Sequence, residues 1–252
     1  MTEKSDWEGM GAASGLLATV MFVLAFVVFM ATDPTGATPY PSINNAQQAP
    51  AYLALYLTRY RLELLFISLG VVLFLWFVGS LHVALKKAEG DPARGSTLAV
   101  TAAGVGAGLM LVSLVLGFTS GLSTSASQAS AVPTLYTAAA LLFAFGGGVL
   151  ALFFFAVAKV VLQAHAMARW LGVLAFIAAF LCLLAFLTPF FDTGVFNAAT
   201  GALGLWTWYT AFVVWVFLAS VMLTVTERRL AKEARTAAPA GPAPAATEGA
   251  VR

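Results

Sequence analysis

The stretch LELLFISLGVVLFLWFVGSLHVAL, residues 62–85, decides the fold class of this chain. It exceeds the ~20 residues that a helix needs to cross ~30 Å of hydrocarbon. Five further apolar runs are of comparable length, and none places a charged residue at mid-membrane depth. The six expected spans are residues 12–30, 62–85, 98–118, 135–162, 170–189 and 203–225. The sequence therefore predicts an all-α, polytopic membrane protein with six transmembrane helices.

Composition supports a membrane location for most of the chain. Hydrophobic residues make up 61% and charged residues 10%, whereas soluble domains carry about 25% charged residues. The net charge of +2 is too small to suggest nucleic acid as a partner. We expect an amino-terminal segment (1–10), a transmembrane domain (11–226) and a tail (227–252), which starts as a charged helix end and continues as a disordered Ala/Pro-rich segment.

Lys and Arg residues predict the orientation of the chain, because cytoplasmic loops carry the excess of these residues. One side of the membrane receives Lys86, Lys87, Arg94, Arg169, Arg228, Arg229, Lys232 and Arg235, and the other receives Arg59 and Arg61. The residues before the first span do not form a secretory signal, so we expect that span to be retained as an anchor. Both termini are predicted to be cytoplasmic, with the protein in the inner (plasma) membrane.

Three tyrosines precede the second span at four-residue steps: Tyr52, Tyr56 and Tyr60. Residues four apart share one face of a helix, and tyrosine is enriched where a membrane meets water. This spacing predicts a short interfacial helix on the outer side of the membrane that runs into the second span, with its tyrosines at headgroup depth.

Small residues at helix-packing spacing mark the third and fourth spans. Gly104 and Gly108 form a GxxxG pattern, and Ala144 and Gly148 repeat the spacing in the fourth span. Small residues let helix backbones approach closely in lipid, so we expect these four residues to pack the two helices together. The glycine triplet at 146–148 could instead break the fourth helix, as in transporters that line a cavity with a broken helix.

A group of charged residues lies where the outer helix meets the second span. Arg59 and Glu63 are four residues apart and share a helix face. Asp33 and Asp192 are the remaining charges of the outer loops and could approach this face. The predicted ligand- or partner-binding residues are Arg59, Arg61, Glu63, Tyr56, Tyr60, Asp33 and Asp192. A salt-bridge clasp that fixes the loop to the bundle is the alternative interpretation.

Histidine and cysteine do not predict a metal or cofactor site. Cys182 lies alone in an apolar span, where cysteine is usually a small core residue. His82 and His165 lie near the inner ends of their spans, so a haem held by both is conceivable, but no carboxylate is placed to orient either ring. Motifs for metal catalysis or phosphate binding are missing from the sequence. We therefore expect no metal and no cofactor.

The layout resembles that of uncharacterised bacterial six-span membrane proteins. The likeness covers most of the chain in the order of its segments. At the level of residues it covers 52–87, including the entry Tyr60-Arg61-Leu62-Glu63 and the basic turn Lys86-Lys87. The resemblance implies a fold and no reaction.

The leading hypothesis is a non-enzymatic membrane protein that binds a lipid-like or small hydrophobic ligand, or a membrane partner, through the outer Arg/Glu/Tyr cluster. Two alternatives stay open: a small-molecule transporter with a broken fourth helix, and an interfacial enzyme acting on lipid with Glu63, Asp192 or Asp33 as base. Expected partners are membrane lipid and either another membrane protein or a second copy of the chain.

Overall fold

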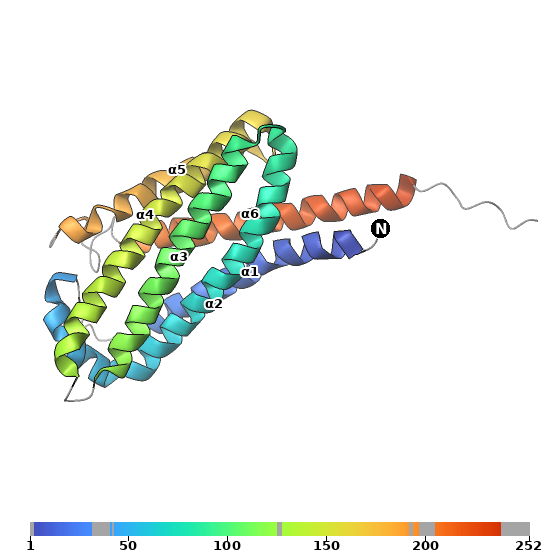
Figure 1. Cartoon of the computed structure of the whole chain (residues 1–252). Coiled ribbons are helices and arrows are strands. Elements are labelled where there is room, and N and C mark those ends of the chain that lie inside the picture. The colour runs from blue at the N-terminus through green and yellow to red at the C-terminus, as the bar shows by residue number, and fades with distance from the viewer. Residues whose placement is uncertain are drawn as a thin grey trace, which may run out of the picture.

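The computed structural model describes residues 3–31, 41, 43–124, 128–191, 194–196 and 205–237, and within them the chain is helical with no strand. The long helices are α1 (Glu3–Met30), α2 (Ala49–Glu89), α3 (Arg94–Leu122), α4 (Val132–Ala164), α5 (Arg169–Ala185) and α6 (Leu205–Ala237), as Figure 1 shows. Short 3-10 helices are η1 (Ile43–Gln48), η2 (Ala129–Ala131) and η3 (Thr188–Phe190). Six helical segments are long and apolar enough to span a membrane. This result confirms the predicted all-α polytopic architecture.

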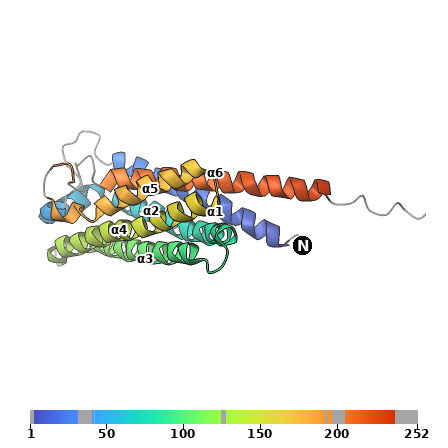
Figure 2. The same cartoon turned by 90° about the horizontal axis from the view of Figure 1, so that it is seen from above.

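The helices form an elongated bundle with two distinct ends. At the Lys86 end, α2 gives way to α3 and α4 gives way to α5; at the Arg59 end lie the start of α4, the end of α3 and η1. Figures 1 and 2 both show α3 alongside α4, and both show α6 projecting past the other helices on the side where α1 begins. The charged segment after residue 226 is thus a continuation of α6.

The predicted interfacial helix is the first part of α2 rather than a separate element. Tyr56 has non-helical angles (φ −119°, ψ 17°), which kink α2 at that point. The side chains of Tyr52 and Tyr60 are buried in the bundle, and the rings of Tyr52 and Tyr56 lie 5.1 Å apart. The rings of Tyr52 and Tyr60 thus fill space between helices, and the headgroup depth of the three tyrosines stays a prediction.

Aromatic rings from four helices fill the centre of the bundle. Phe74 of α2 meets Phe153 of α4 edge to face, with ring centroids 5.7 Å apart. Phe212 of α6 lies 5.0 Å from Phe74 and 5.3 Å from Phe22 of α1. Edge-to-face pairs contribute about 0.5–1.5 kcal/mol each beyond the area they bury. These contacts tie α1, α2, α4 and α6 to one another.

The close contact between α3 and α4 uses glycines other than those predicted. A Cβ atom on Gly146 would lie 2.9 Å from the carbonyl oxygen of Gly106, and one on Gly106 would lie 3.0 Å from that of Gly146. Cβ atoms on Gly104 or Gly108 would have no atom within 4 Å. The prediction that Gly104 and Gly108 pack the helices is wrong, because this face of α3 points away from α4.

The fourth helix is unbroken at the glycine triplet. Residues 146–148 are helical and buried within α4. A Cβ atom on Gly147 would meet the Trp208 ring, and one on Gly148 would meet the Phe186 ring. Ala144, predicted with Gly148 as a packing residue, is also buried. The triplet therefore lets neighbouring backbones and rings approach α4, and the predicted alternative of a broken helix is wrong.

Glu89 anchors the start of α3 at the Lys86 end. Its Oε1 accepts a hydrogen bond from the Gly95 amide at 2.7 Å, and its Oε2 accepts one from the Ser96 amide at 2.8 Å. Amides in the first turn of a helix have no partner within the helix, and a carboxylate there also meets the positive end of the helix dipole. Gly90, with φ +73°, lets the chain turn directly after Glu89.

The Gly106–Gly146 contact predicts different effects on stability for the same glycine-to-alanine change at two positions. We expect Gly146→Ala to lower the free energy of unfolding by about 1–3 kcal/mol, because its methyl group would overlap the backbone of α3. Gly104→Ala adds the same methyl group to an open surface and should leave stability unchanged. Unfolding in mixed micelles with increasing sodium dodecyl sulfate measures both. Equal losses for the two variants would contradict the packing described here.

The Glu89 contacts predict a graded loss of stability. Glu89→Ala removes both acceptors and should lower the free energy of unfolding by about 0.5–2 kcal/mol, the usual range for loss of a helix cap. Glu89→Gln keeps one acceptor oxygen and should lose less. The same micelle titration compares the two variants, and an Ala variant as stable as the unaltered protein would show that the cap is dispensable.

Candidate functional site

The charged residues of α2 differ sharply in exposure. Arg59 is exposed and its guanidinium donates a hydrogen bond to the carbonyl of Ala31, directly after α1. Arg61 is half-buried, and its Nη2 donates to the carbonyl of Gly121 in α3 at 3.3 Å. Glu63 is only 7% exposed. The burial of the charged side chains therefore increases from Arg59 through Arg61 to Glu63 along α2.

Two of these side chains bury polar atoms that have no hydrogen-bond partner. In the described part of the chain, Arg61 Nε and Glu63 Oε2 are both shielded from solvent, and neither has a donor or acceptor within reach. A buried polar group without a partner costs about 1–3 kcal/mol, and more when it is charged. Such groups are rare in folded proteins, which makes this part of α2 the candidate functional site.

Helix geometry separates Arg61 from Glu63. Two residues apart on an α-helix means a rotation of about 200°, so the two side chains leave α2 in nearly opposite directions. Arg61 contacts the end of α3, whereas Glu63 lies within electrostatic range of Tyr209 of α6. The structure thus divides the predicted Arg/Glu/Tyr cluster into an Arg61 side and a Glu63 side.

Tyr60 lies between these two sides. Its side chain is buried, hydrogen-bonds to Ser120 of α3 and lies within electrostatic range of Glu63. A Cβ atom on Gly117 would stand 3.0 Å from the Tyr60 hydroxyl, so the absence of a side chain at that position lets the tyrosine fit against α3. Tyr56 is half-buried at the kink one turn earlier.

Two predicted site residues, Asp33 and Asp192, lie outside the described residues. The proposed approach of these carboxylates to Arg59 and Arg61 therefore stays a prediction. Arg59 and Glu63, which the spacing of four residues suggested as a pair, have opposite environments, one exposed and one buried.

Sequence reasoning missed the contribution of α6 to this region. Trp208 is 1% exposed, its ring lies 5.6 Å from that of Phe143 of α4, and its Nε1 is a third buried polar atom without a partner among the described residues. Tyr209 donates a hydrogen bond to the carbonyl of Phe22 in α1 at 3.0 Å. Nothing in the spacing of these residues indicated that the two rings turn inward.

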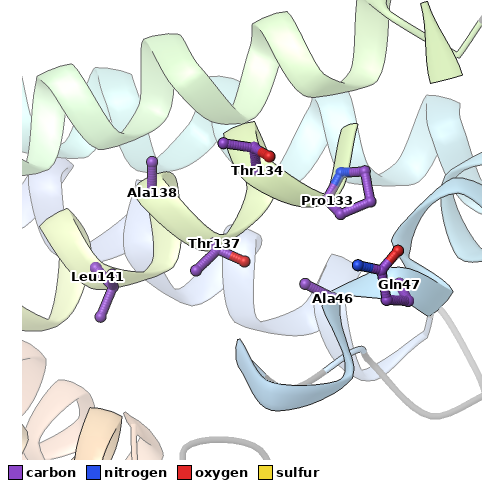
Figure 3. A pocket seen from close by; sticks show the side chains of 7 residues that line it. All are labelled: Ala46, Gln47, Pro133, Thr134, Thr137, Ala138 and Leu141. Atoms are coloured by element: carbon purple, nitrogen blue, oxygen red, sulfur yellow. The ribbon is translucent and has the colours of Figure 1, made fainter. Parts of the chain in front are cut away.

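A groove of about 430 Å³ opens at the Arg59 end between η1 and the start of α4, as Figure 3 shows. Its wall on α4 is one helix face, formed by Thr134, Thr137, Ala138 and Leu141, and η1 contributes Ala46 and Gln47. The volume is in the range of small-molecule sites. Its lining combines two hydroxyls and one amide with alanine, proline and leucine side chains.

The described residues contain no group of three or more His, Cys, Asp or Glu that could hold a metal ion. The ring of His82 pairs through Nδ1 with the carbonyl of Ser96 at 3.1 Å. His165 directly follows α4 in a left-handed conformation (φ 54°). Cys182 is a free, buried thiol. His82 thus contacts the backbone, and Cys182 lies in the core.

Comparison with protein-family models, with curated proteins and with solved structures finds no match to this chain. The fold and the site define a class of protein: a multi-pass helical membrane protein. Among its described residues, buried polar atoms without a hydrogen-bond partner lie at one end of the bundle. Any narrower function has to be argued from the chain's own residues.

Proposed function

We propose that this protein binds a lipid-like ligand with an anionic headgroup at the Arg59 end of the bundle. The observation that carries the proposal is the buried Nε of Arg61, which has no acceptor among the described residues. A phosphate or carboxylate oxygen supplies the missing acceptor, and guanidinium groups bind such anions through paired hydrogen bonds.

The depth of Arg61 supports a headgroup as the ligand. Arg61 and Lys86 lie 25 positions apart on α2, or roughly 37 Å along a helix. A bilayer with its headgroup layers is about 40–45 Å thick, so both residues reach headgroups of opposite leaflets. Leu62 and Leu65 beside Arg61 are exposed and offer an apolar surface to acyl chains.

The other two hypotheses lose ground on specific observations. Transport through a broken fourth helix lacks its premise, because α4 is continuous through residues 146–148. An enzyme acting at the interface needs a base that reaches its substrate; of its three candidate bases, Glu63 is buried, whereas Asp33 and Asp192 lie outside the described residues. We therefore favour binding of a lipid over either alternative.

The proposed location is the inner (plasma) membrane, with both termini in the cytoplasm. The support is the arrangement of Lys and Arg, since the Lys86 end also carries Lys87, Arg94 and Arg169, in line with the preference of cytoplasmic loops for these residues. The Arg59 end would then face the outside.

Labelling of single cysteines tests this orientation. In a Cys182→Ala background, we introduce Gln128→Cys at the Arg59 end or Asp91→Cys at the Lys86 end; both positions are exposed. A membrane-impermeant maleimide should label the Gln128→Cys variant in intact cells and the Asp91→Cys variant only after the membrane is opened. The reverse pattern would invert the proposed topology.

Lipid retention tests the binding role of Arg61. We expect Arg61→Gln to weaken retention of phosphatidylglycerol about tenfold or more, because an anion paired with a charged donor contributes roughly 1.5–3 kcal/mol. Native mass spectrometry of protein in detergent, titrated with phosphatidylglycerol or zwitterionic phosphatidylethanolamine, measures the bound fraction.

Arg59→Gln is the matched control, since it removes the same charge from the same helix but from an exposed side chain. It should reduce retention much less than Arg61→Gln. Equal retention by the unaltered protein and Arg61→Gln, with both variants monodisperse and helical, would overturn the proposed function.

A further inference from the structure

The Glu63 carboxyl is buried in the helix packing and is not part of the proposed lipid site. Its side chain is 7% exposed, and its Oε2 is shielded from solvent without a hydrogen-bond partner. No ion pair that includes Glu63 is found among the described residues. Arg61, the nearest cation in sequence, leaves α2 on the opposite side and contacts α3.

The side chains of Tyr60 and Tyr209 lie within electrostatic range of this carboxyl. Tyr209 donates its hydrogen to the carbonyl of Phe22. Tyr60 hydrogen-bonds to Ser120, and the Ser120 hydroxyl donates to the carbonyl of Gly117 at 2.7 Å. A tyrosine hydroxyl can accept a hydrogen bond as well as donate one.

The described parts of α1, α3 and α4 contribute few ionisable side chains. The described side chains of α1 and of α3 after Arg94 are all non-titratable, and α4 contributes only Tyr136 and Lys159. Tyr136 donates to the carbonyl of Pro41 at 2.8 Å, and Lys159 lies towards the Lys86 end of α4. Among the described side chains of these helices, no cation is paired with Glu63.

We propose that Glu63 is a proton-binding site, neutral in this closed arrangement and ionised when the bundle opens at the Arg59 end. An unpaired carboxylate in a water-poor interior costs several kcal/mol, whereas a neutral acid can donate its single O–H to a tyrosine oxygen. Binding and release of a proton here is a function separate from lipid binding, and it makes the packing of α2 against α6 depend on pH.

The position of Glu63 gives the proton a short route to water. Glu63 and Lys86 are 23 positions apart, or roughly 34 Å along the helix, while the hydrocarbon core is about 30 Å thick. With Lys86 at one membrane surface, Glu63 lies near the opposite boundary of the core. Exchange with solvent then needs only a local opening beside the start of α6.

Labelling with dicyclohexylcarbodiimide tests the proposal on the full-length protein in nanodiscs. This apolar reagent adds the protonated acid across one of its C=N bonds, and the adduct rearranges to a stable N-acylurea that peptide mass spectrometry locates. We expect an adduct at Glu63 whose yield falls as the pH rises, because the ionised form does not react. Glu63→Gln should lose the adduct, and Glu89→Gln, which alters a carboxyl at the other end of the bundle, should keep it.

Thermal unfolding supplies a second measurement that does not need the reagent. Because protonation favours the closed bundle, the melting temperature of the unaltered protein should fall at alkaline pH, and Glu63→Gln should flatten this dependence while folding normally. No adduct at Glu63 at any pH, or an adduct whose yield does not change with pH while the protein stays folded, overturns the proposal. Either result leaves the Arg61 lipid site unaffected, since that site is read by phosphatidylglycerol retention.

Discussion

Inside hydrocarbon, each backbone amide and carbonyl must find its hydrogen-bond partner within the protein, and this constraint determines the rest of the structure. Each helix satisfies this constraint with its own backbone hydrogen bonds. The helices then associate through packing and through a few hydrogen bonds between them. Here α3 and α4 meet through backbone at Gly106 and Gly146, and Ser113 of α3 donates to the carbonyl of Ala139 in α4 at 2.7 Å. The aromatic core is possible because these backbone needs are already met.

The same constraint explains which parts of the fold could be predicted. Length and apolarity identify a membrane helix directly, so all six spans were found. Which face of a helix meets protein could not be found, because Leu, Phe and Val suit lipid and protein interior equally. Gly104 and Gly108 have the spacing of a packing motif and point away from α4, whereas the real contact uses Gly106, which is not part of the GxxxG pattern.

The candidate site, too, could be predicted only in part from the sequence. Sequence proximity placed Arg59, Arg61 and Glu63 in one cluster, and its location at the end of a span was informative because charges there are costly to bury. The separation of Arg61 from Glu63 follows from helix rotation, but the electrostatic proximity of Glu63 to Tyr209 involves α6, almost 150 residues later in the chain. Tyr209 belongs to a segment that could equally well form an aromatic belt, so the sequence contains no signal that joins it to Glu63.

The two proposals also constrain each other through charge. A neutral Glu63 adds no negative charge near Arg61, which would favour an anionic headgroup over a zwitterionic one. Ionisation of Glu63 would add a negative charge about two residues away, where Coulomb interactions are only partly screened by salt over a Debye length of about 8–10 Å. Proton release at Glu63 must therefore weaken anion binding at Arg61, and by linkage a bound anion must hold the proton on Glu63 more tightly. The proposed lipid site and the proposed proton site would in this way be thermodynamically coupled, although their side chains leave the helix in opposite directions.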